Sequence, residues 1–449
     1  MTTSQAGFRR PAAHRPRLPR RRLAAALAAL ILVAATPATA LDLKYDIGGY
    51  LRHSDNMNLG ETTEISDTVA APFFRFDAEQ AGARVQIRAL GEIEYDDYLD
   101  NSFDDQLRGK LSGRMNWAVV PERLDFVIQD YLDQQPIDQL DAFSPGNQQQ
   151  VNMLVAGPTL HLRFNPVTRA QIDARYGNTY AEETTSFRGD RYSAAARLLR
   201  DLNPTSTVSA NLESTRVEYN AAGSAADYKR HDGYVGYVRH RGNLNVELDL
   251  GYSRLERDIA SGHSSSALVR ADADWKASGR SRVRANIRYQ YADATQSLIT
   301  PTLDFSDRSM AYLAYPDLVV DPNVFRERVA KVSYQFTADR TSLRLQPYYR
   351  RVDYVDDGLD DQDRRGLLAT IDYRLRPLTT LSLLVGHEQR KYDIVARKDR
   401  DNVINLGLAH QFTRHWIGQV DLRHSERDSS AAGRSYSANS AMVSILYRR

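Results

Sequence analysis

The sequence predicts a transmembrane antiparallel β-barrel of about twenty strands, with eighteen as the fallback count. Three observations predict this fold class. Segments of about ten residues alternate between apolar and charged side chains, the connections between them alternate between short and long, and aromatic residues gather at both ends of the segments. Because side chains on a strand point to opposite faces with a period of two, each segment has one apolar and one charged face.

The first 40 residues have the features of an export signal peptide. Seven Arg and no acidic residue accompany the apolar run 23–35, and Ala38-Thr39-Ala40 forms a small-x-small cleavage site. The apolar run is too short for a membrane-spanning helix. We therefore expect a signal peptide at residues 1–40 and a single outer-membrane barrel at residues 41–449. The formal charge is +2 for the whole chain but −5 after residue 40, with 52 basic and 57 acidic residues.

The segment from Ala267 to Tyr291 shows the strand pattern in its simplest form. Val269 and Ala271 alternate with Arg270 and Asp272, and a Gly-containing connector leads to a second arm that alternates in the same way. Such a pair is typical of a β-hairpin. Each arm has roughly the ten residues that a tilted strand needs to cross the hydrocarbon of a membrane.

The connections predict both the class of barrel and the number of strands. The short connections are 81–82, 120–122, 165–167, 203–205, 241–243, 277–279, 338–340, 376–378 and 413–414. The long ones are 55–66, 97–105, 134–149, 181–189, 221–226, 258–264, 295–323, 356–363, 396–401 and 425–433. A sandwich with Greek-key connections mixes both lengths at both ends. Strict alternation instead favours tight periplasmic turns and longer extracellular loops.

Aromatic side chains at the strand ends support a membrane barrel, because such residues form girdles at both interfaces. The loop-end set is Tyr95, Tyr98, Tyr131, Tyr176, Tyr180, Tyr219, Tyr252, Tyr289, Tyr291, Tyr354 and Tyr392. The turn-end set is Trp117, Phe164, Trp275, Phe336, Tyr373, Phe412 and Trp416. Pro72, Pro158 and Pro347 fall inside predicted strands, where each removes a ladder donor and marks either a bulge or a misplaced boundary.

Several classes of function lack sequence support. The chain has no Cys, so it has neither a disulfide framework nor a thiolate metal site. The ten His show neither zinc-ligand spacing nor a G-x-S-x-G context, and no basic cluster follows residue 40. We expect no catalytic residue, cofactor, metal or nucleic-acid partner. The oxygens of Asp55-Asn56-Met57-Asn58 suit a calcium ion or a cation bridged to lipopolysaccharide, but an Asx-rich turn is the favoured interpretation.

Charged residues on the polar strand faces are the candidate lining of a wet lumen, since a barrel this wide encloses water unless it is plugged. Opposed basic and acidic rows tune the selectivity of a pore, while the same residues taken in pairs are cross-strand ion pairs that stiffen the wall. The individual pairs favour the second interpretation. The candidates are Arg88, Glu92, Asp173, Arg175, Glu247, Asp249, Arg270, Asp272, Asp274, Arg284, Arg288, Arg344 and Arg350.

The longest connection, 295–323, is the predicted constriction. Its apolar content argues against disorder, so we expect it to fold inward or to rest on the rim. Phe305, Tyr312 and Tyr315 are the candidate constriction residues, and such rings stack on sugars. A cap packed on neighbouring loops is an equal alternative.

Two short segments resemble a known family. Residues 43–50 (LKYDIGGY) with 54–59 (SDNMNL), and residues 147–152 (NQQQVN) with 156–158 (AGP), are similar to the β-barrel porins encoded with exopolysaccharide and PEP-CTERM/exosortase systems, the EpsL-like outer-membrane proteins. The resemblance implies a role in making or exporting surface polysaccharide, and it supplies no catalytic residues.

The sequence thus predicts a passive porin-like channel or structural component for exopolysaccharide export. The expected partners are outer-membrane lipid and lipopolysaccharide, with exopolysaccharide and its export machinery. One alternative is a non-conducting barrel whose loops bind surface glycan. Another is a hydrolase with its active site at the rim of the barrel.

Overall fold

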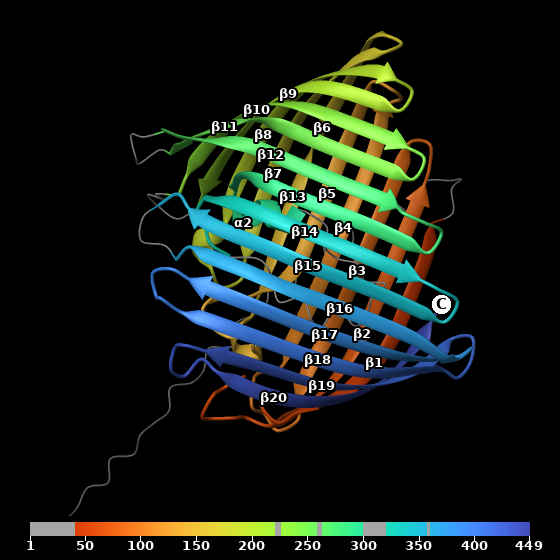
Figure 1. The fold of residues 1–449 in the computed structure, drawn as a ribbon, viewed down its shortest axis with the longest axis vertical. Coiled ribbons are helices and arrows are strands. Elements are labelled where there is room, and N and C mark those ends of the chain that lie inside the picture. Colours follow the sequence, from red (N-terminus) through yellow and green to blue (C-terminus); the bar gives the residue numbers. More distant parts are fainter. Residues whose placement is uncertain (1–40, 221–225, 258–262, 300–319, 357–359) are drawn as a thin grey trace, which may run out of the picture. The chain divides into compact units, whose positions relative to one another are not determined.

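The computed structural model describes residues 41–220, 226–257, 263–299, 320–356 and 360–449, so the predicted signal peptide lies outside the described residues. Each strand pairs antiparallel with the next along the chain, and β20 pairs with β1, which closes the sheet (Figure 1). The predicted fold class and the count of twenty strands are confirmed. The strands are β1 (Asp42–Ser54), β2 (Asp67–Ala81), β3 (Val85–Tyr98), β4 (Gln106–Val120), β5 (Leu124–Gln135), β6 (Gln149–Asn165), β7 (Thr168–Ala181), β8 (Gly189–Asn203), β9 (Ser206–Tyr219), β10 (Tyr228–Arg241), β11 (Leu244–Arg257), β12 (His263–Lys276), β13 (Ser281–Ala292), β14 (Phe325–Thr337), β15 (Thr341–Tyr354), β16 (Gln362–Arg376), β17 (Thr379–Tyr392), β18 (Lys398–Gln411), β19 (Trp416–Ser429) and β20 (Tyr436–Arg448).

Short and long connections alternate around the barrel as predicted, and they define a turn end and a loop end (Figure 1). Within the described ranges the helical elements are short, and all belong to loop-end connections: the 3-10 turns η2 (Pro145–Asn147) and η3 (Thr185–Phe187) and the helix α2 (Ala294–Ile299). No helix in the described part of the chain is long and apolar enough to span a membrane.

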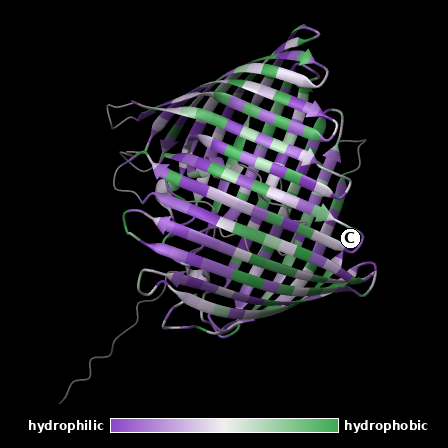
Figure 2. Ribbon diagram, viewed as in Figure 1, coloured by the Kyte–Doolittle hydropathy of each residue, from purple (hydrophilic) through white to green (hydrophobic). Residues whose placement is uncertain are grey.

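The outer surface of the barrel is apolar because every second residue of each strand points outward. Leu212 is 69% exposed and Ile287 is 49% exposed, although both are large hydrophobic residues inside strands. The alternation is visible along the strands in Figure 2, where hydrophilic and hydrophobic residues follow one another. Such a surface is stable only against lipid or another apolar partner.

The aromatic residues follow the predicted girdles only in part. At the turn end Trp117, Phe164 and Trp275 are exposed, and at the loop end Tyr95 and Tyr252 are exposed. Five of the predicted loop-end tyrosines are instead buried, and for them the girdle prediction is wrong. Strand parity turns most of them to the inner face, and Tyr291 is covered by an interior apolar cluster. The buried five are Tyr98, Tyr131, Tyr219, Tyr291 and Tyr392.

Pro72, Pro158 and Pro347 all lie within strands, and the predicted bulge or misplaced boundary is wrong at all three. On one side of each proline two ladder pairs are missing, and the register is unchanged beyond the gap. Proline has no N–H to donate, so the ladder is interrupted without an extra residue. The position next to Pro158 must be glycine, because a Cβ at Gly157 would lie 2.0 Å from the carbonyl oxygen of Ala174 on β7 and would clash with it.

The first loop locks the seam at which the barrel closes. Asn56 is fully buried and donates from Nδ2 to the carbonyl oxygens of Gly60 at 2.8 Å and Ser437 on β20 at 3.0 Å. The backbone N–H of Asn439 donates to Asp55 Oδ1 at 2.7 Å, and its Nδ2 donates to Asp55 Oδ2 at 2.8 Å. The Asp-Asn motif is therefore a turn tied to the neighbouring strand, as the favoured interpretation expected.

Replacing Asn56 by Asp should destabilise the closed barrel by about 2–3 kcal/mol, because a buried carboxylate would face two carbonyl oxygens with no proton to donate. The measurement is the midpoint of urea unfolding in lipid vesicles. Asn58→Asp is the matched control, since the Asn58 side chain bonds to Thr63 and Ile65 within the same loop. Equal losses in the two variants would contradict the seam assignment.

Candidate functional site: the lumen and the segment that crosses it

The predicted lining residues lie on the strand faces opposite the lipid-facing ones. On β12 and β13, for example, Arg270 and Arg288 alternate with the exposed Trp275 and Ile287. All thirteen candidates share this inward parity, so the role of wall residues remains the prediction for the set. They are distributed over β3 (Arg88, Glu92), β7 (Asp173, Arg175), β11 (Glu247, Asp249), β12 (Arg270, Asp272, Asp274), β13 (Arg284, Arg288) and β15 (Arg344, Arg350).

Many of these wall charges are paired, either across the ladder or along one strand. Asp272 accepts from Asn286 Nδ2 at 2.6 Å and forms an ion pair with Arg288 at 2.7 Å. Asp173 accepts from Thr159 at 2.7 Å and pairs with Arg175 at 3.1 Å and with Arg197. Opposite charges at hydrogen-bonding distance largely cancel, so this part of the wall is polar and carries little net charge.

The connection between β5 and β6, residues 136–148, crosses the lumen, and we call it the crossing segment. Gln139 Oε1 accepts from Gln362 Nε2 on β16 at 2.9 Å. The carbonyl oxygen of Leu140 accepts from Arg397, just before β18, at 2.5 Å. Because β6 and β16 are ten strands apart in a closed sheet of twenty, these bonds join opposite walls.

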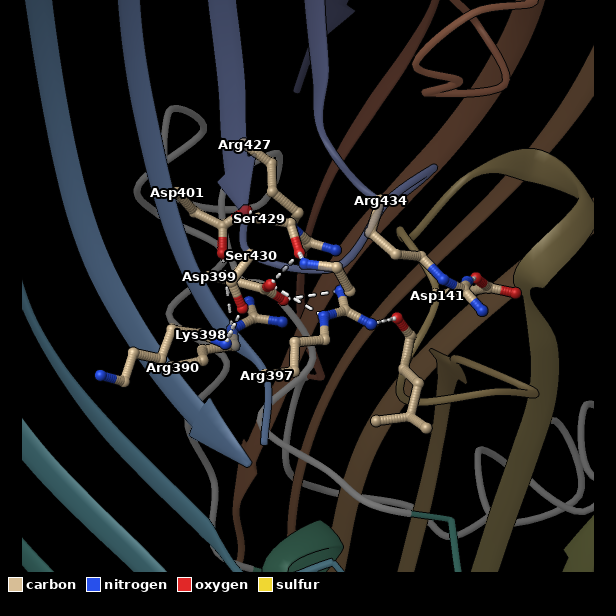
Figure 3. Close-up of polar contacts among 12 residues, drawn as sticks. Asp141, Arg390, Arg397, Lys398, Asp399, Asp401, Arg427, Ser429, Ser430 and Arg434 are labelled. Atoms are coloured by element: carbon tan, nitrogen blue, oxygen red, sulfur yellow. Dashed lines mark hydrogen bonds and ion pairs between the residues drawn. The ribbon is translucent and has the colours of Figure 1, made fainter. Parts of the chain in front are cut away.

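Two arginines hold the far end of the crossing segment. Asp141 forms an ion pair with Arg434 in the β19–β20 connection, and the two side chains lie next to each other in Figure 3. Arg397 is itself fixed by a bidentate pair with Asp399, at 2.8 and 2.6 Å, and both side chains are buried. Ser429 donates to the same carboxylate at 2.6 Å. A bidentate pair fixes the plane of the guanidinium, so its remaining N–H is aimed at the crossing segment.

The wall behind this contact is a buried network of alternating charges. Asp401 accepts from Arg427 Nε at 2.7 Å and lies 3.7 Å from Arg390, which pairs with Glu388. All four side chains are at most 7% exposed. Buried ion pairs contribute rigidity more than net stability, because desolvation offsets their attraction. The crossing segment therefore docks against a stiff surface.

Asn147 gives the crossing segment its shape from within. Its Oδ1 accepts the backbone N–H of Asp138 at 2.8 Å, and its Nδ2 donates to the carbonyl oxygens of Asp138 at 2.7 Å and Ala142 at 3.1 Å. The buried amide of Asn147 thus forms hydrogen bonds with backbone groups that have no partner strand in this segment. Gln149, at the start of β6, accepts the N–H groups of Glu183 and Thr184 and so ties the base of the segment to the next loop.

Asn147→Ala should loosen the crossing segment without unfolding the barrel. The variant loses the three hydrogen bonds that the Asn147 side chain makes within the crossing segment. We expect the free energy of local unfolding of this segment to fall by about 2–3 kcal/mol, with no change in the stability of the barrel. The measurement is amide hydrogen exchange of residues 136–148, which should become markedly faster. Exchange in β6 is the internal reference, and unchanged protection of the segment would contradict the role of Asn147.

The long connection between β13 and β14 also enters the barrel. Asp293 is fully buried, accepts from Tyr228 on β10 at 2.6 Å and pairs with Arg191 on β8, five strands away. Gln296 in α2 accepts from Arg230 at 3.0 Å. Burial raises the pKa of the Asp293 carboxyl, but the charge of Arg191 and the hydrogen bond from Tyr228 outweigh it, so the pKa is lowered overall.

An interior apolar cluster surrounds this anchor. It combines residues of β6, β7, β9, β10, β11 and β13 with Phe187 of η3 and with both described ends of the β13–β14 connection. The predicted constriction residues Phe305, Tyr312 and Tyr315 lie outside the described residues. The described ends of their connection do fold inward. The members of the cluster are Val151, Ala181, Phe187, Val217, Tyr219, Tyr228, Leu255, Tyr291, Ala294, Val320 and Val324.

Sequence reasoning missed the crossing segment and its partners Arg397 and Arg434. It treated residues 134–149 as one more loop, because length and apolar content pointed to 295–323. One available signal was the NQQQ motif at 147–150, which carries the family resemblance and holds the two structural amides of Asn147 and Gln149. The partner arginines had no local signal, since their role depends on a contact across the barrel with a segment far away in the sequence.

A closed antiparallel barrel with an apolar outer surface, exposed aromatics at both ends and a charged interior is a porin-like outer-membrane barrel. Residues 340–449 match the model of the family described as "Putative beta-barrel porin 2". No curated protein matches the sequence.

Solved structures with this fold include a ferric enterobactin receptor (PfeA) mutant from Pseudomonas aeruginosa, at 8% identity and a TM-score of 0.50, covering 92% of this chain and 81% of that one. The vanillate-bound OpdK structure from the same organism is 11% identical with a TM-score of 0.39, covering 91% and 98%. These likenesses concern the fold alone.

Proposed function

We propose that this barrel is a passive outer-membrane channel whose aperture is set by the crossing segment, and that it serves the export of surface polysaccharide. The observation that carries the proposal is the bonding of residues 136–148 to the opposite wall through Gln362, Arg397 and Arg434. A segment fixed at both ends narrows a wide lumen to a defined gap. Conduction through it needs no catalytic step, only a wet and charged passage.

The net negative charge at the loop end indicates which class of polysaccharide the channel would pass. The ten loop-end connections contain 22 acidic and 4 basic residues, a net charge of −18, whereas the nine turns contain 2 acidic and 5 basic residues. An acidic mouth repels polyanions and attracts cations within a Debye length of about 8–10 Å. We therefore propose neutral or amino-sugar chains rather than acidic ones as the substrate.

The link to exopolysaccharide has two supports. The segments that resemble exopolysaccharide-associated porins are the first strand with the seam-closing first loop, and the end of the crossing segment with the strand that follows it. The hydroxyl groups of sugars also match a wall of paired charges and amides, which offers both donors and acceptors. The gap that the crossing segment leaves would then admit an extended glycan.

Planar-bilayer recording with liposome swelling tests this function. We expect discrete conductance steps, entry of neutral oligosaccharides, and slower entry of oligogalacturonate of equal length at low salt. The difference should shrink at about 1 M salt, where screening reduces the Debye length to roughly 3 Å. An absence of steps, both in the natural chain and after removal of the crossing segment, would overturn the channel.

The second candidate is a non-conducting barrel whose loops bind glycan at the cell surface. The interior apolar cluster favours it, because side chains of β6, β7, β9, β10, β11 and β13 pack with both ends of the β13–β14 connection and would fill part of the lumen. Surface binding of oligosaccharide by vesicles that show no conductance would select this function over the first.

A further inference from the structure

A hollow of about 530 Å³ lies on the outer surface of the barrel, across β7–β11. Small outward residues, Ala194, Ala196, Ser214 and Gly233, form its floor. The strands themselves continue without a break beneath it, since each pairs fully with its neighbour. The hollow therefore comes from missing side-chain volume on the lipid-facing surface, and its size falls in the range of roughly 300–1,000 Å³ that is typical of ligand sites.

Three large apolar side chains stand out from the surface along one edge of this floor. Ile172 on β7, Leu212 on β9 and Tyr252 on β11 are 46%, 69% and 57% exposed. They share one cross-strand row with Ala196 and Gly233, as the register shows. A hydrocarbon chain lying in the hollow would contact these side chains and cover the exposed floor.

Basic side chains edge the hollow on the side of the loops. His231 lies at the edge and is paired in register with Arg254. One row nearer the loops, Lys229 is paired with Arg216. The acidic partners Glu256 and Glu218 extend beside and beyond them, with Arg254 Nε 3.0 Å from Glu256. The surface thus offers an apolar hollow with cationic side chains on its loop side. A lipid with an acyl chain and a phosphate group has the complementary arrangement of apolar and anionic parts.

We propose that this hollow binds a phosphorylated glycolipid of the outer leaflet, the chemistry of the lipid A part of lipopolysaccharide. One acyl chain would lie over Ala194, Ser214 and Gly233. A phosphate would reach the guanidinium of Arg254 and the ammonium of Lys229. Arginine and lysine bind phosphate through charge-assisted hydrogen bonds, and each buried methylene of the chain adds to the affinity.

A second copy of the chain fits the hollow less well. A stable protein interface buries at least about 1,000 Å² with close complementarity, whereas this hollow is a local gap between protruding side chains. Leu212 and Tyr252 stand out from the surface and would hold a flat partner away from the floor. A flexible acyl chain passes between them, and the basic edge then selects an anionic head group.

Lipid titration of the purified full-length barrel in detergent, followed by native mass spectrometry, tests the site. The probes are lipid A and the same lipid with both phosphates removed. Ala194→Leu with Gly233→Leu fills the hollow; a Cβ at Gly233 meets only Leu212, at an ordinary 3.5 Å. Lys229→Gln with Arg254→Gln removes the two phosphate contacts. Ala330→Leu and Lys391→Gln are matched controls at outward positions of β14 and β17, and heat-modifiable gel migration verifies folding of every variant.

We expect roughly tenfold weaker lipid A binding in the filled variant, as when about two methylenes are no longer buried. The charge variant should bind lipid A no better than the phosphate-free lipid, and the controls should bind like the natural chain. Undiminished binding by the filled variant, or an equal loss in Ala330→Leu, would overturn the proposal. Dimers that dissociate in the filled variant while lipid binding persists would assign the hollow to a second copy. None of these outcomes depends on conductance.

Discussion

Replacing residues 137–147 with Gly-Ser-Gly should raise the single-channel conductance by roughly two- to fivefold, because a barrel with more than sixteen strands has a wide lumen and the crossing segment would no longer span it. The strands tolerate this change, since Gln135 and Gln149 are paired in register and a short hairpin linker joins them. The far wall loses the partners of Gln362, Arg397 and Arg434 but keeps its own ion pairs.

Two further variants distinguish an effect on the width of the passage from an effect on how firmly the crossing segment is held. Asp141→Asn removes the ion pair with Arg434 and leaves the segment in place, so we expect more frequent fluctuations at nearly unchanged mean conductance. Replacing the exposed tip residues Ile394 and Val395 with Ser should leave the recordings as they are. A conductance unchanged by the linker would mean that the crossing segment does not limit the passage.

Asp293→Asn should cost about 3–5 kcal/mol of barrel stability, because it leaves the guanidinium of Arg191, whose side chain is only 11% exposed, without its counter-ion. Asn keeps the size of the side chain, so the loss reflects charge and not packing. The loss should appear in urea unfolding from lipid vesicles. Asp339→Asn is the control: Asp339 is 96% exposed, 4.0 Å from Arg280, and should change stability by less than about 0.5 kcal/mol.

The same carboxylate gives a pH dependence with a definite sign. Its pKa is lower in the folded chain than in the unfolded one, where Asp titrates near about 3.9. Its contribution is therefore complete above that pH and is lost as the pH falls through the folded value. Stability of the natural barrel should decline more steeply below about pH 4 than that of Asp293→Asn. Parallel pH profiles would show that Asp293 is not ionised in the fold.

The strands could be predicted from the sequence because the features that define a barrel strand lie within a few neighbouring residues. Alternation of Val269 with Arg270 marks which side chain meets lipid, and Gly, Pro and Asn mark the turns without information from distant residues. The same local view failed for Tyr98 and Tyr392, which were assigned to a girdle by their place near a strand end. A shift of one residue along a strand moves a side chain from the lipid-facing to the lumen-facing side. The side on which a tyrosine lies can therefore be assigned only when the register of its strand is known.

The candidate site was predicted less well than the fold. The charged wall residues follow from alternation, and the carboxylate partners of Arg175 and Arg288 are near in sequence or on an adjoining strand. Arg397 and Arg434 meet the crossing segment across the barrel, a contact that no local pattern encodes. The predicted constriction had length and aromatic content in its favour, whereas the crossing segment is held by buried amides such as that of Asn147.

By itself the sequence determined the closed-barrel class, the twenty strands, the alternation of turns and loops and the polarity of each strand face. These features depend on periods of two and on turn residues, which act over a few positions. Only the tertiary structure decided which loop enters the lumen, which tyrosines turn inward and where the outer surface is hollow. Those outcomes depend on residues that closure brings together, Leu140 with Arg397 and Asn56 with Ser437, and closure is a property of the whole sheet.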